Sequence, residues 1–511
     1  MIAKLLSSVT IGLDAKAVEI EVDASHGFPC FNIVGLGDKA VEESKERVRS
    51  AIHNSGFKFP SQKRLVINLA PADIKKEGTI YDLPIALGIL MASGQIDEKL
   101  LPKNSIFLGE LALSGDLRHT RSVLPIILFA KQRKIKNVFL PEANLNEARL
   151  VEGLNVYPLE SLNHLLGHIS KSRLIEVIES KGAEISPRTD FEFDFAFIKG
   201  QEHVKRAMEI AAAGGHNILM TGAPGSGKTL LARAIPSILP LLTKEEILEI
   251  TKIYSISGLL SDDQPLILER PFRAPHHTIS DVAMVGGGTS PRPGEVSLAH
   301  RGVLFLDEFP EFSRATLESL RQPLEDGIIS VSRIKFNINY PARFILVAAQ
   351  NPCPCGYFGD KKKNCICSPA QIMRYRQKIS GPLLDRIDLH VEVPRLEYKE
   401  IAQEAATEGS VSVRERAQKA RDLQQNRFDK LNILTNAEIK AAQIEKFCSL
   451  SAEAREILKR AVESYGLSGR AIHRLMKVGR TIADLAQSEE ILPQHLAEAI
   501  QYRAKTEENN L

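Results

Sequence analysis

The sequence predicts a multidomain α/β protein made of three successive parts. Its 511 residues suffice for roughly two to four domains, and 43% of them are hydrophobic, as in ordinary globular proteins. Strand-like and helix-like segments alternate in residues 1–175, which predicts an α+β domain, and again in residues 196–395, which predicts an α/β core. Residues 396–511 have an almost purely helical pattern. The polar stretch 176–195 is the expected linker.

The first part shows the periodicities of both kinds of secondary structure. Residues 18–24 alternate apolar and charged side chains, as a half-buried strand does, and residues 64–73 predict a second strand. An amphipathic helix is expected at 38–56 and a mostly apolar helix at 82–94, followed by a strand and turn at 105–115. The clearest helices of the third part are AEAREILKRAVESYG (452–466), GRAIHRLMKVGRTIADLAQ (469–487) and QHLAEAIQYRAK (494–505).

The composition of the chain limits which classes of function we expect. The formal net charge is only +3, so any polyanion contact must come from local clusters such as Lys361–Lys363. No uninterrupted apolar stretch is as long as the roughly 18 residues of a membrane span. Asp14 interrupts the first apolar run before any cleavage site. We therefore expect no signal peptide, no membrane partner and a cytoplasmic protein.

A phosphate-binding loop is the most specific motif. Residues 216–235 combine a short apolar strand, a glycine-rich loop and a helix, and the loop matches G-x-x-x-x-G-K-[ST]. Lys228 would reach the terminal phosphates, and the Thr229 hydroxyl would bind Mg²⁺. The expected nucleotide-binding residues are Gly222, Ala223, Pro224, Gly225, Ser226, Gly227, Lys228 and Thr229. ATP and Mg²⁺ are thus the expected cofactors, and a chance glycine-rich turn is the alternative.

Two further strands end in polar side chains. A buried apolar strand leads to Asp307 and Glu308, at the sheet edge where ligands of open α/β sheets bind. Asp307 is expected to hold Mg²⁺, and Glu308 is expected to polarise the attacking water. The strand 343–350 leads to Gln350 and Asn351, and an amide there can position that water. An acidic strand end in solvent and a loop-forming Asn before Pro are the alternatives.

Together these strands resemble the AAA+ superfamily, with Walker A, Walker B and sensor-1 residues at matching places. Longer runs resemble its magnesium-chelatase-like branch and, within that branch, the YifB/ComM family: residues 270–288, 291–308, 351–360 and 374–393. The resemblance covers essentially the whole chain. It implies an AAA+ P-loop core with a helical lid and a homo-oligomer in the family's form of a hexameric ring. It also implies a DNA helicase that promotes branch migration in homologous recombination during natural transformation.

The resemblance further implies two functional arginines. In this branch the Arg of the PLLDR(I/F)D segment acts as an arginine finger in the neighbouring subunit's site, and here that residue is Arg386. An ion pair of Arg386 with Asp385 or Asp388 is the alternative. The sensor-2 Arg of the helical lid falls on Arg470, with Arg474 one turn later as the rival.

The first part resembles the Lon-protease-like domain found in this family and in bacterial RadA. The likeness is carried by GELALSGDL (109–117) and IKNVFLPEA (135–143). Peptidase activity needs a Ser nucleophile and a Lys base, but Ile80 and Leu124 stand where these are expected. We therefore predict no peptidase activity, with nearby Ser122 and Lys131 as the alternative under a shifted alignment. A role in ring assembly or nucleic-acid contact is expected instead.

Four of the six cysteines cluster in fifteen residues: Cys353, Cys355, Cys365 and Cys367. Without an export signal, such clustering favours a metal over disulfides, and four soft ligands suit tetrahedral Zn²⁺. The C-x-C spacing departs from the usual zinc pattern, so free thiols and redox chemistry remain alternatives. Cys30 and Cys448 are expected to pack in cores. His276 and His277 are expected to serve the fold rather than a metal.

Two insertions of the branch face the pore of the ring. One should fall within 250–300 and include Gly286–Gly288, and the other is a hairpin at 327–344. Arg333 and Lys335 near the hairpin tip suit phosphate contact, so single-stranded or branched DNA is the expected partner. A hairpin edge guarded by charge is the alternative. A magnesium-chelatase motor subunit and a chaperone-like remodeller of protein complexes are the alternative functions.

Overall fold

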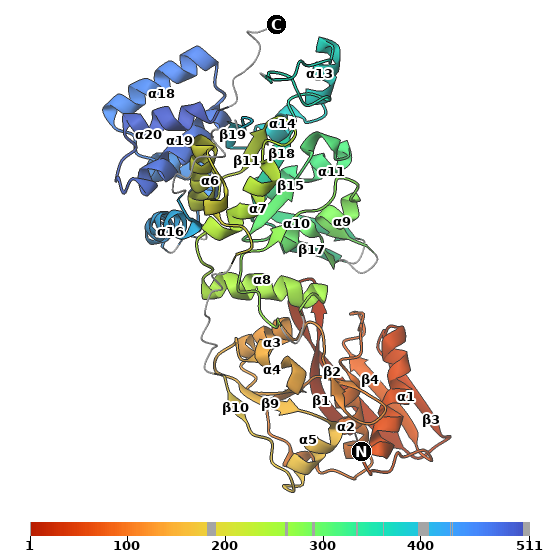
Figure 1. Cartoon of the computed structure of the whole chain (residues 1–511). Helices are drawn as coiled ribbons and strands as arrows, with labels where there is room; N and C mark the ends of the chain where they lie inside the picture. The colour runs from red at the N-terminus through yellow and green to blue at the C-terminus, as the bar shows by residue number, and fades with distance from the viewer. Residues whose placement is uncertain are drawn as a thin grey trace. The chain divides into compact units, whose positions relative to one another are not determined.

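The chain divides into two units in the computed structural model (Figure 1). The described residues are 2–180, 191–260, 264–288, 292–333, 336–360, 362–396, 408–429, 431 and 433–503, and the side chains of 332–337 are not described. The first unit comprises Met1–Ser186 and Lys244–Ile267, and the second comprises Pro187–Thr243 and Leu268–Leu511. Among the described residues, no helix has the length and apolar character that crossing a membrane requires.

Two four-stranded sheets and five α-helices form most of the first unit. One sheet has the order β1-β2-β4-β3, with β1 (Ile2–Ile11), β2 (Asp14–Ser25), β3 (Cys30–Val34) and β4 (Arg64–Ala70). The other has the order β10-β9-β8-β5, with β5 (Ser105–Phe107), β8 (Asn137–Pro141), β9 (Asn155–Leu159) and β10 (Ile178–Glu179). The helices are α1 (Lys39–Asn54), α2 (Asp82–Ala92), α3 (Val123–Gln132), α4 (Leu145–Ala148) and α5 (Leu162–Ile169).

The predicted helices of this unit form where the sequence indicates. Helix α1 begins after Asp38, whose carboxylate accepts a hydrogen bond from the backbone N–H of Val41. It ends at Asn54, and Gly56 follows with a φ of 81°. Every residue of α2 is buried, as its apolar sequence predicts. Ile80 and Leu124 are also buried, and the likeness of this unit to the Lon-protease-like domain stays a prediction.

Helix α8 (Lys244–Ser257) belongs to the first unit, although the sequence analysis placed it in the central part. Leu248 of this helix and Leu266 beyond it pack against the first unit's core. The Lys252 ammonium pairs with Asp14 at 3.1 Å, and the Ser255 hydroxyl donates to a buried carboxylate, that of Glu147, at 3.0 Å. Residues 244–267, which lie between the two nucleotide motifs, are therefore structurally part of the N-terminal unit, whereas Gly286–Gly288 belong to the second unit.

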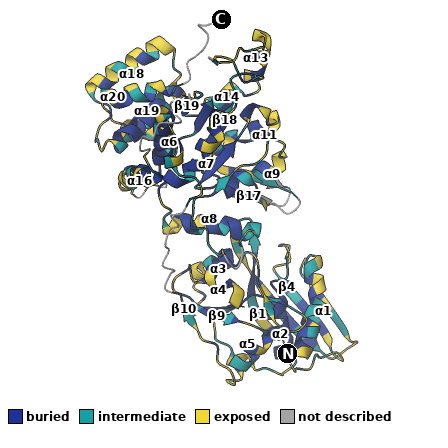
Figure 2. Cartoon of the chain, in the orientation of Figure 1, coloured by how far each residue is buried: buried dark blue, intermediate teal, exposed yellow. Residues whose placement is uncertain are grey.

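A parallel five-stranded sheet forms the centre of the second unit. Its order is β12-β15-β18-β11-β19, with β11 (Ile218–Thr221), β12 (Phe272–Arg273), β15 (Val303–Leu306), β18 (Ile345–Gln350) and β19 (Leu389–Glu392). Figure 2 shows these strands as largely buried. Because every pairing is parallel, the polar residues that follow β11, β15 and β18 share one edge of the sheet. The α/β core predicted from the sequence is confirmed.

Helices account for the rest of the second unit. The residues of this unit before 396 include α6 (Glu202–Gly214), α7 (Lys228–Ile238), α12 (Arg321–Asp326), α13 (Pro369–Arg376) and α14 (Gly381–Leu384). The C-terminal part contains α16 (Ser410–Arg427), α18 (Ala452–Tyr465), α19 (Gly469–Leu485) and α20 (Pro493–Gln501), so the three helices predicted there are present. Much of α18 is exposed (Figure 2).

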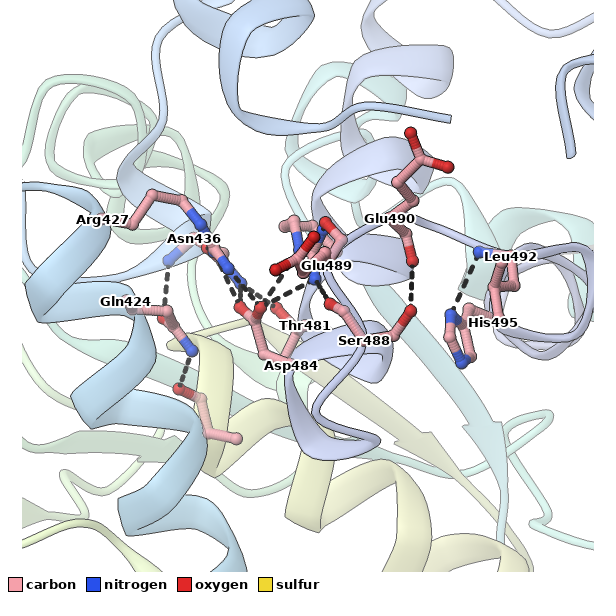
Figure 3. A network of polar contacts seen from close by, with 12 residues as sticks. Gln424, Arg427, Asn436, Thr481, Asp484, Ser488, Glu489, Glu490, Leu492 and His495 are labelled. Carbon is pink, nitrogen blue, oxygen red and sulfur yellow. Dashed lines mark hydrogen bonds and ion pairs between the residues drawn. The ribbon is translucent and has the colours of Figure 1, made fainter. Parts of the chain in front are cut away.

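A buried polar network holds the C-terminal helices together (Figure 3). Asp484 accepts hydrogen bonds from Arg427 at 2.9 Å and from Asn436 at 2.7 Å. Asn436 also donates to the Thr481 hydroxyl at 3.0 Å, and Thr481 contacts His216 Nε2 at 2.7 Å. Since His216 lies two residues before β11, this network fixes the helical part to one end of the central sheet.

Candidate active site

The phosphate loop has the tight backbone that its glycines permit. It leaves β11 and enters α7, with Gly225 at a φ of 76° and Gly227 at a φ of 93°. Residues other than glycine rarely adopt these backbone conformations. At Gly222, an added Cβ would lie 2.4 Å from the Val393 carbonyl oxygen, so this position also excludes larger residues. The structure thus shows the strand–loop–helix arrangement that the motif requires.

Lys228 lies along the inside of this loop. Its ammonium donates hydrogen bonds to the carbonyl oxygens of Gly222 at 2.7 Å and Ala223 at 3.0 Å, and to Asn351 Oδ1 at 3.2 Å. Burial lowers the pKa of Lys228, while the nearby charge of Asp307 opposes this shift. A cation with reduced solvation attracts an anion more strongly than one in bulk water.

Thr229 at the start of α7 and Asp307 at the end of β15 bring two oxygen ligands together. The Thr229 hydroxyl donates to Asp307 Oδ2 at 2.9 Å, and the backbone N–H of Glu308 donates to Asp307 Oδ1 at 2.9 Å. Hydroxyl and carboxylate oxygens are hard ligands, the kind that Mg²⁺ prefers. These two residues therefore fit the magnesium role expected from the sequence.

Glu308 stands at the edge of the site on a strained backbone. Its φ is 51°, and its side chain is exposed. His277 Nδ1 lies 3.4 Å from Glu308 Oε2, a contact that the sequence analysis missed because the two residues lie far apart in the chain. His277 thus faces the proposed water-polarising carboxylate, and its expected role in the fold rather than at a metal stays a prediction.

The two amides at the end of β18, Gln350 and Asn351, have different partners. Asn351 accepts from Lys228, whereas the Gln350 amide donates to the Thr221 hydroxyl at 3.1 Å, at the end of β11. Asn351 is therefore the amide that faces the phosphate loop. A further amide, Gln201, donates to the carbonyl oxygen of Ser226 at 2.9 Å. Gln201 belongs to no motif, so its role could not be inferred from the sequence.

Several groups of this loop are positioned to bind a phosphate chain. The Ser226 hydroxyl oxygen is buried and has no hydrogen-bond partner among the described residues. Nothing lies within 4 Å of the positions that Cβ atoms would take at Gly225 and Gly227. Backbone N–H groups at the start of α7 favour an anion. The residues present thus match an ATP–magnesium group.

Arg386 lies at the opposite edge of the sheet from the phosphate loop. Its carbonyl oxygen accepts a hydrogen bond from the Asn217 amide at 3.0 Å, and Asn217 immediately precedes β11. The loop begins where β11 ends, and a four-residue strand spans about 13 Å. The Arg386 backbone is therefore separated from its own chain's phosphate loop by the length of this strand.

The Arg386 side chain is almost fully buried. One terminal nitrogen forms an ion pair with Glu325 on α12, and the other donates to the Pro382 carbonyl oxygen at 2.7 Å. Its ion-pair partner is thus Glu325 rather than Asp385 or Asp388. Burial lowers the pKa of Arg386, and neighbouring arginines lower it further.

The two candidate sensor-2 arginines lie beside Arg386. Arg470 is 70% exposed and its Nη2 lies 3.8 Å from Glu325 Oε1, so Arg470 and Arg386 contact the same carboxylate. Arg474 instead donates to the buried Asp388 at 2.8 Å. Asp388 also contacts His216, so Arg474 serves the packing of the helices on the sheet. The exposed Arg470 is the better candidate.

The four clustered cysteines converge in the structure. Their sulfur atoms all lie within 4.8 Å of one another, and this is the group of possible metal ligands found among the described His, Cys, Asp and Glu residues. All six cysteines are unpaired, and Cys448 is buried as expected, while Cys30 is half-exposed. Backbone N–H groups of Tyr357 and Ile366 hold the pKa of Cys355 to about 6. The cluster could hold a metal.

The candidate DNA contacts are only partly described. Strands β16 (Ile328–Arg333) and β17 (Phe336–Pro341) form the predicted antiparallel hairpin, with Arg333 opposite Phe336. Lys335 and Lys361 lie outside the described residues, as does the side chain of Arg333. Gly286 and Gly287 form the short strand β13, which pairs with β14 (Arg292–Pro293).

Two relatives resemble this chain over nearly its whole length. Competence protein ComM of Haemophilus influenzae is 44% identical over 510 residues, which cover 98% of this chain and 97% of that protein. YifB of Escherichia coli is 43% identical over 499 residues, which cover 97% of this chain and 95% of that protein. The chain belongs to the ComM/YifB family.

Family profiles extend the relationship of this ComM/YifB member to magnesium chelatase. The profile of magnesium chelatase subunit ChlI matches residues 194–401, a second ChlI profile matches 20–144, and the ChlI C-terminal profile matches 407–503. The magnesium-chelatase 38 kDa subunit of Cereibacter sphaeroides is 27% identical over 176 residues, 31% of this chain and 53% of that protein. The second unit is therefore an AAA+-like domain of the magnesium-chelatase type.

Proposed function

We propose that this chain is an ATP-driven DNA translocase or helicase that works as a homo-oligomeric, hexameric ring in the cytoplasm. Its task would be branch migration in homologous recombination during natural transformation. One observation carries the proposal: Lys228, Thr229 and Asp307 meet at one edge of the sheet, while the arginine finger candidate lies at the other. The name of the Haemophilus influenzae relative, a competence protein, supports the biological setting.

Each residue has a proposed role in hydrolysis. The loop Gly222–Thr229 binds the phosphates of ATP through its backbone N–H groups and Lys228. Mg²⁺, bound by Thr229 and Asp307, would neutralise phosphate charge. Glu308 polarises the attacking water, and Asn351 orients it. Arg386 and Arg470 act together on the phosphates bound by the neighbouring subunit.

The DNA contact is proposed on the β16–β17 hairpin. Arg333 and Lys335 would bind the phosphates of single-stranded or branched DNA, because a hairpin of this branch projects into the ring's pore. The first unit, proposed to be Lon-protease-like without peptidase activity, would serve ring assembly or DNA contact. Helix α8 lies in the chain segment between the nucleotide motifs but belongs to the first unit. This supports a mechanical role for the first unit.

A magnesium-chelatase-type motor subunit is the second candidate function. The ChlI profiles along the chain favour it, and a chaperone-like remodeller is a further alternative. A chelatase motor requires partner subunits and a porphyrin, so DNA should leave its ATPase rate unchanged. The full-length similarity to a competence protein favours the DNA function instead.

The test uses purified full-length protein, ATP and a labelled three-way DNA junction. The proposal predicts strand displacement by the wild type and none by Lys228→Ala. It also predicts an ATPase rate that rises with DNA and DNA binding that weakens steeply with salt. Absence of displacement by the wild type, or displacement that persists in Lys228→Ala, would overturn it.

A further inference from the structure

We propose that Cys353, Cys355, Cys365 and Cys367 bind one tetrahedral Zn²⁺ ion, and that the loop closed by this metal supports the phosphate-binding loop of the same chain. The zinc site involves the cysteines alone. The support of the phosphate-binding loop rests on the proposed function, because that function assigns ATP to this loop.

The sulfur separations fit a single ion. Cys353 Sγ lies 3.4 Å from Cys355 Sγ and 3.6 Å from Cys365 Sγ, and the Cys355–Cys365 separation is also 3.6 Å. Tetrahedral zinc with Zn–S bonds of about 2.3 Å places its sulfurs about 3.8 Å apart. A disulfide would need about 2.05 Å, and an iron–sulfur cluster separates its cysteines farther because several irons lie between them.

The surrounding backbone is arranged to stabilise thiolates. The N–H of Cys355 donates to Cys367 Sγ at 3.4 Å, and the N–H of Cys367 donates to Cys365 Sγ at 3.4 Å. The N–H of Phe358 donates to Cys353 Sγ at 3.3 Å. Hydrogen bonds of this kind orient metal ligands. Four thiolates leave no open position, which is typical of a structural zinc site rather than a catalytic one.

Gly356 carries the direct contact between this cysteine loop and the phosphate loop. An added Cβ at Gly356 would lie 2.6 Å from the ring atoms of Pro224. The Gly356 backbone therefore packs against Pro224 with no room for a side chain. Gly356 also donates its N–H to the Cys353 carbonyl oxygen at 2.9 Å, so its position depends on the metal-binding turn.

Arg395 makes a second connection between the two loops. Its Nη2 donates to the Pro224 carbonyl oxygen at 3.3 Å, and its Nη1 lies 3.8 Å from Asp360 Oδ2. Asp360 is fixed within the cysteine loop by the N–H of Lys362 at 2.7 Å. Asn351, two residues before Cys353, supplies a third connection through its hydrogen bond from Lys228. Loss of the metal should therefore displace Pro224 and Asn351 together.

The metal is tested on the full-length chain by elemental analysis and by the absorption spectrum of the cobalt-substituted protein. We expect one zinc per chain, a tetrahedral tetrathiolate cobalt spectrum, and loss of both in Cys365→Ser/Cys367→Ser. Cys30→Ser, a half-exposed cysteine of the first unit, should retain the zinc. A wild-type chain without stoichiometric zinc, or a double variant that keeps it, overturns the metal site.

The support of the phosphate loop is tested by two glycine variants and a fluorescent ATP analogue. Gly356→Ala should keep its zinc but bind the analogue about tenfold more weakly, because the added methyl overlaps Pro224. Gly359→Ala is the matched control, since Gly359 lies in the same loop at a φ of 77° with nothing within 4 Å of its Cβ position. Equal affinity in the two variants overturns this support. If the wild type binds no nucleotide, the proposed function fails with it, whereas the zinc measurement still decides the metal site.

Discussion

Arg386 and Arg470 contact the two oxygens of one carboxylate, that of Glu325. The sequence places them more than eighty residues apart, in the core and in the C-terminal helices. Their common partner brings two guanidinium groups to the sheet edge that faces away from the chain's own phosphate loop. A pair of cations at this position suits the terminal phosphates of a nucleotide held by a neighbouring subunit.

Replacement of these arginines should impair catalysis without loss of nucleotide binding. We expect Arg386→Ala to lower the ATPase rate by about a thousandfold, because a finger stabilises charge that develops in the transition state. Arg470→Ala should act in the same direction, while Arg455→Ala, an exposed arginine on α18, should not. Steady-state ATPase and fluorescent-nucleotide binding measure the two effects. Unchanged turnover in Arg386→Ala would exclude the finger.

Glu308→Gln should separate binding from hydrolysis. The amide keeps the size of the side chain but cannot polarise water as a general base, so we expect turnover to fall about a hundredfold or more. ATP affinity should be retained. Glu311→Gln, which removes a carboxylate that pairs with Lys378 at 2.9 Å, is the control and should stay active. Equal turnover of the two variants would assign the base elsewhere.

Asp388→Asn should destabilise the second unit at neutral pH. Burial alone would raise the pKa of Asp388, but Arg474 and the hydrogen bond with His216 hold it well below its ordinary 3.8. Removing one partner of such a buried pair costs about 3–5 kcal/mol. Thermal unfolding of the wild type and the variant at pH 7 measures the difference.

The pH dependence of this difference follows from the sign of the shift. A carboxyl whose folded pKa is depressed stabilises the fold above its unfolded pKa, and this contribution is lost as the pH falls toward the folded pKa. The gap between wild type and Asp388→Asn should therefore be full above about pH 4 and shrink below it. A gap that widens in acid would contradict the assigned ion pair.

If the β16–β17 hairpin binds DNA, removal of its basic side chains should reduce the stimulation of the ATPase rate by DNA. Arg333→Ala/Lys335→Ala should keep its basal ATPase rate but lose most of the DNA stimulation. The salt slope of single-strand binding should fall by about 1.4 if two phosphate contacts are lost. Lys459→Ala/Arg460→Ala, two exposed cations on α18, is the matched control. If both double variants respond to DNA like the wild type, the DNA path runs elsewhere.

The nucleotide motifs could be predicted because each is short and contiguous. The loop that carries Lys228 follows one apolar strand and Asp307 follows another, and parallel pairing brings the ends of such strands to one edge of a sheet. The contacts of His277 and Arg395 could not be predicted, because each is a single polar residue that long-range packing brings to the site. The Cys spacing indicated a metal, but only the structure shows Gly356 against Pro224.

The assignment of α8 shows a different limit of the sequence. Its apolar periodicity predicts a helix, and that pattern is the same whichever unit the helix packs against. Position in the chain favoured the central part, whereas Leu248 and Lys252 contact the first unit. Domain membership is thus decided by complementary surfaces rather than by order along the chain.

The most direct test of shared active sites is the ATPase activity of mixed rings. Lys228→Ala and Arg386→Ala proteins should each be inactive alone. Equal mixing before assembly gives about a quarter of the interfaces an intact phosphate loop facing an intact arginine. We therefore predict that the mixture regains about a quarter of the wild-type ATPase rate. A mixture as inactive as its two components would contradict catalysis between neighbouring subunits.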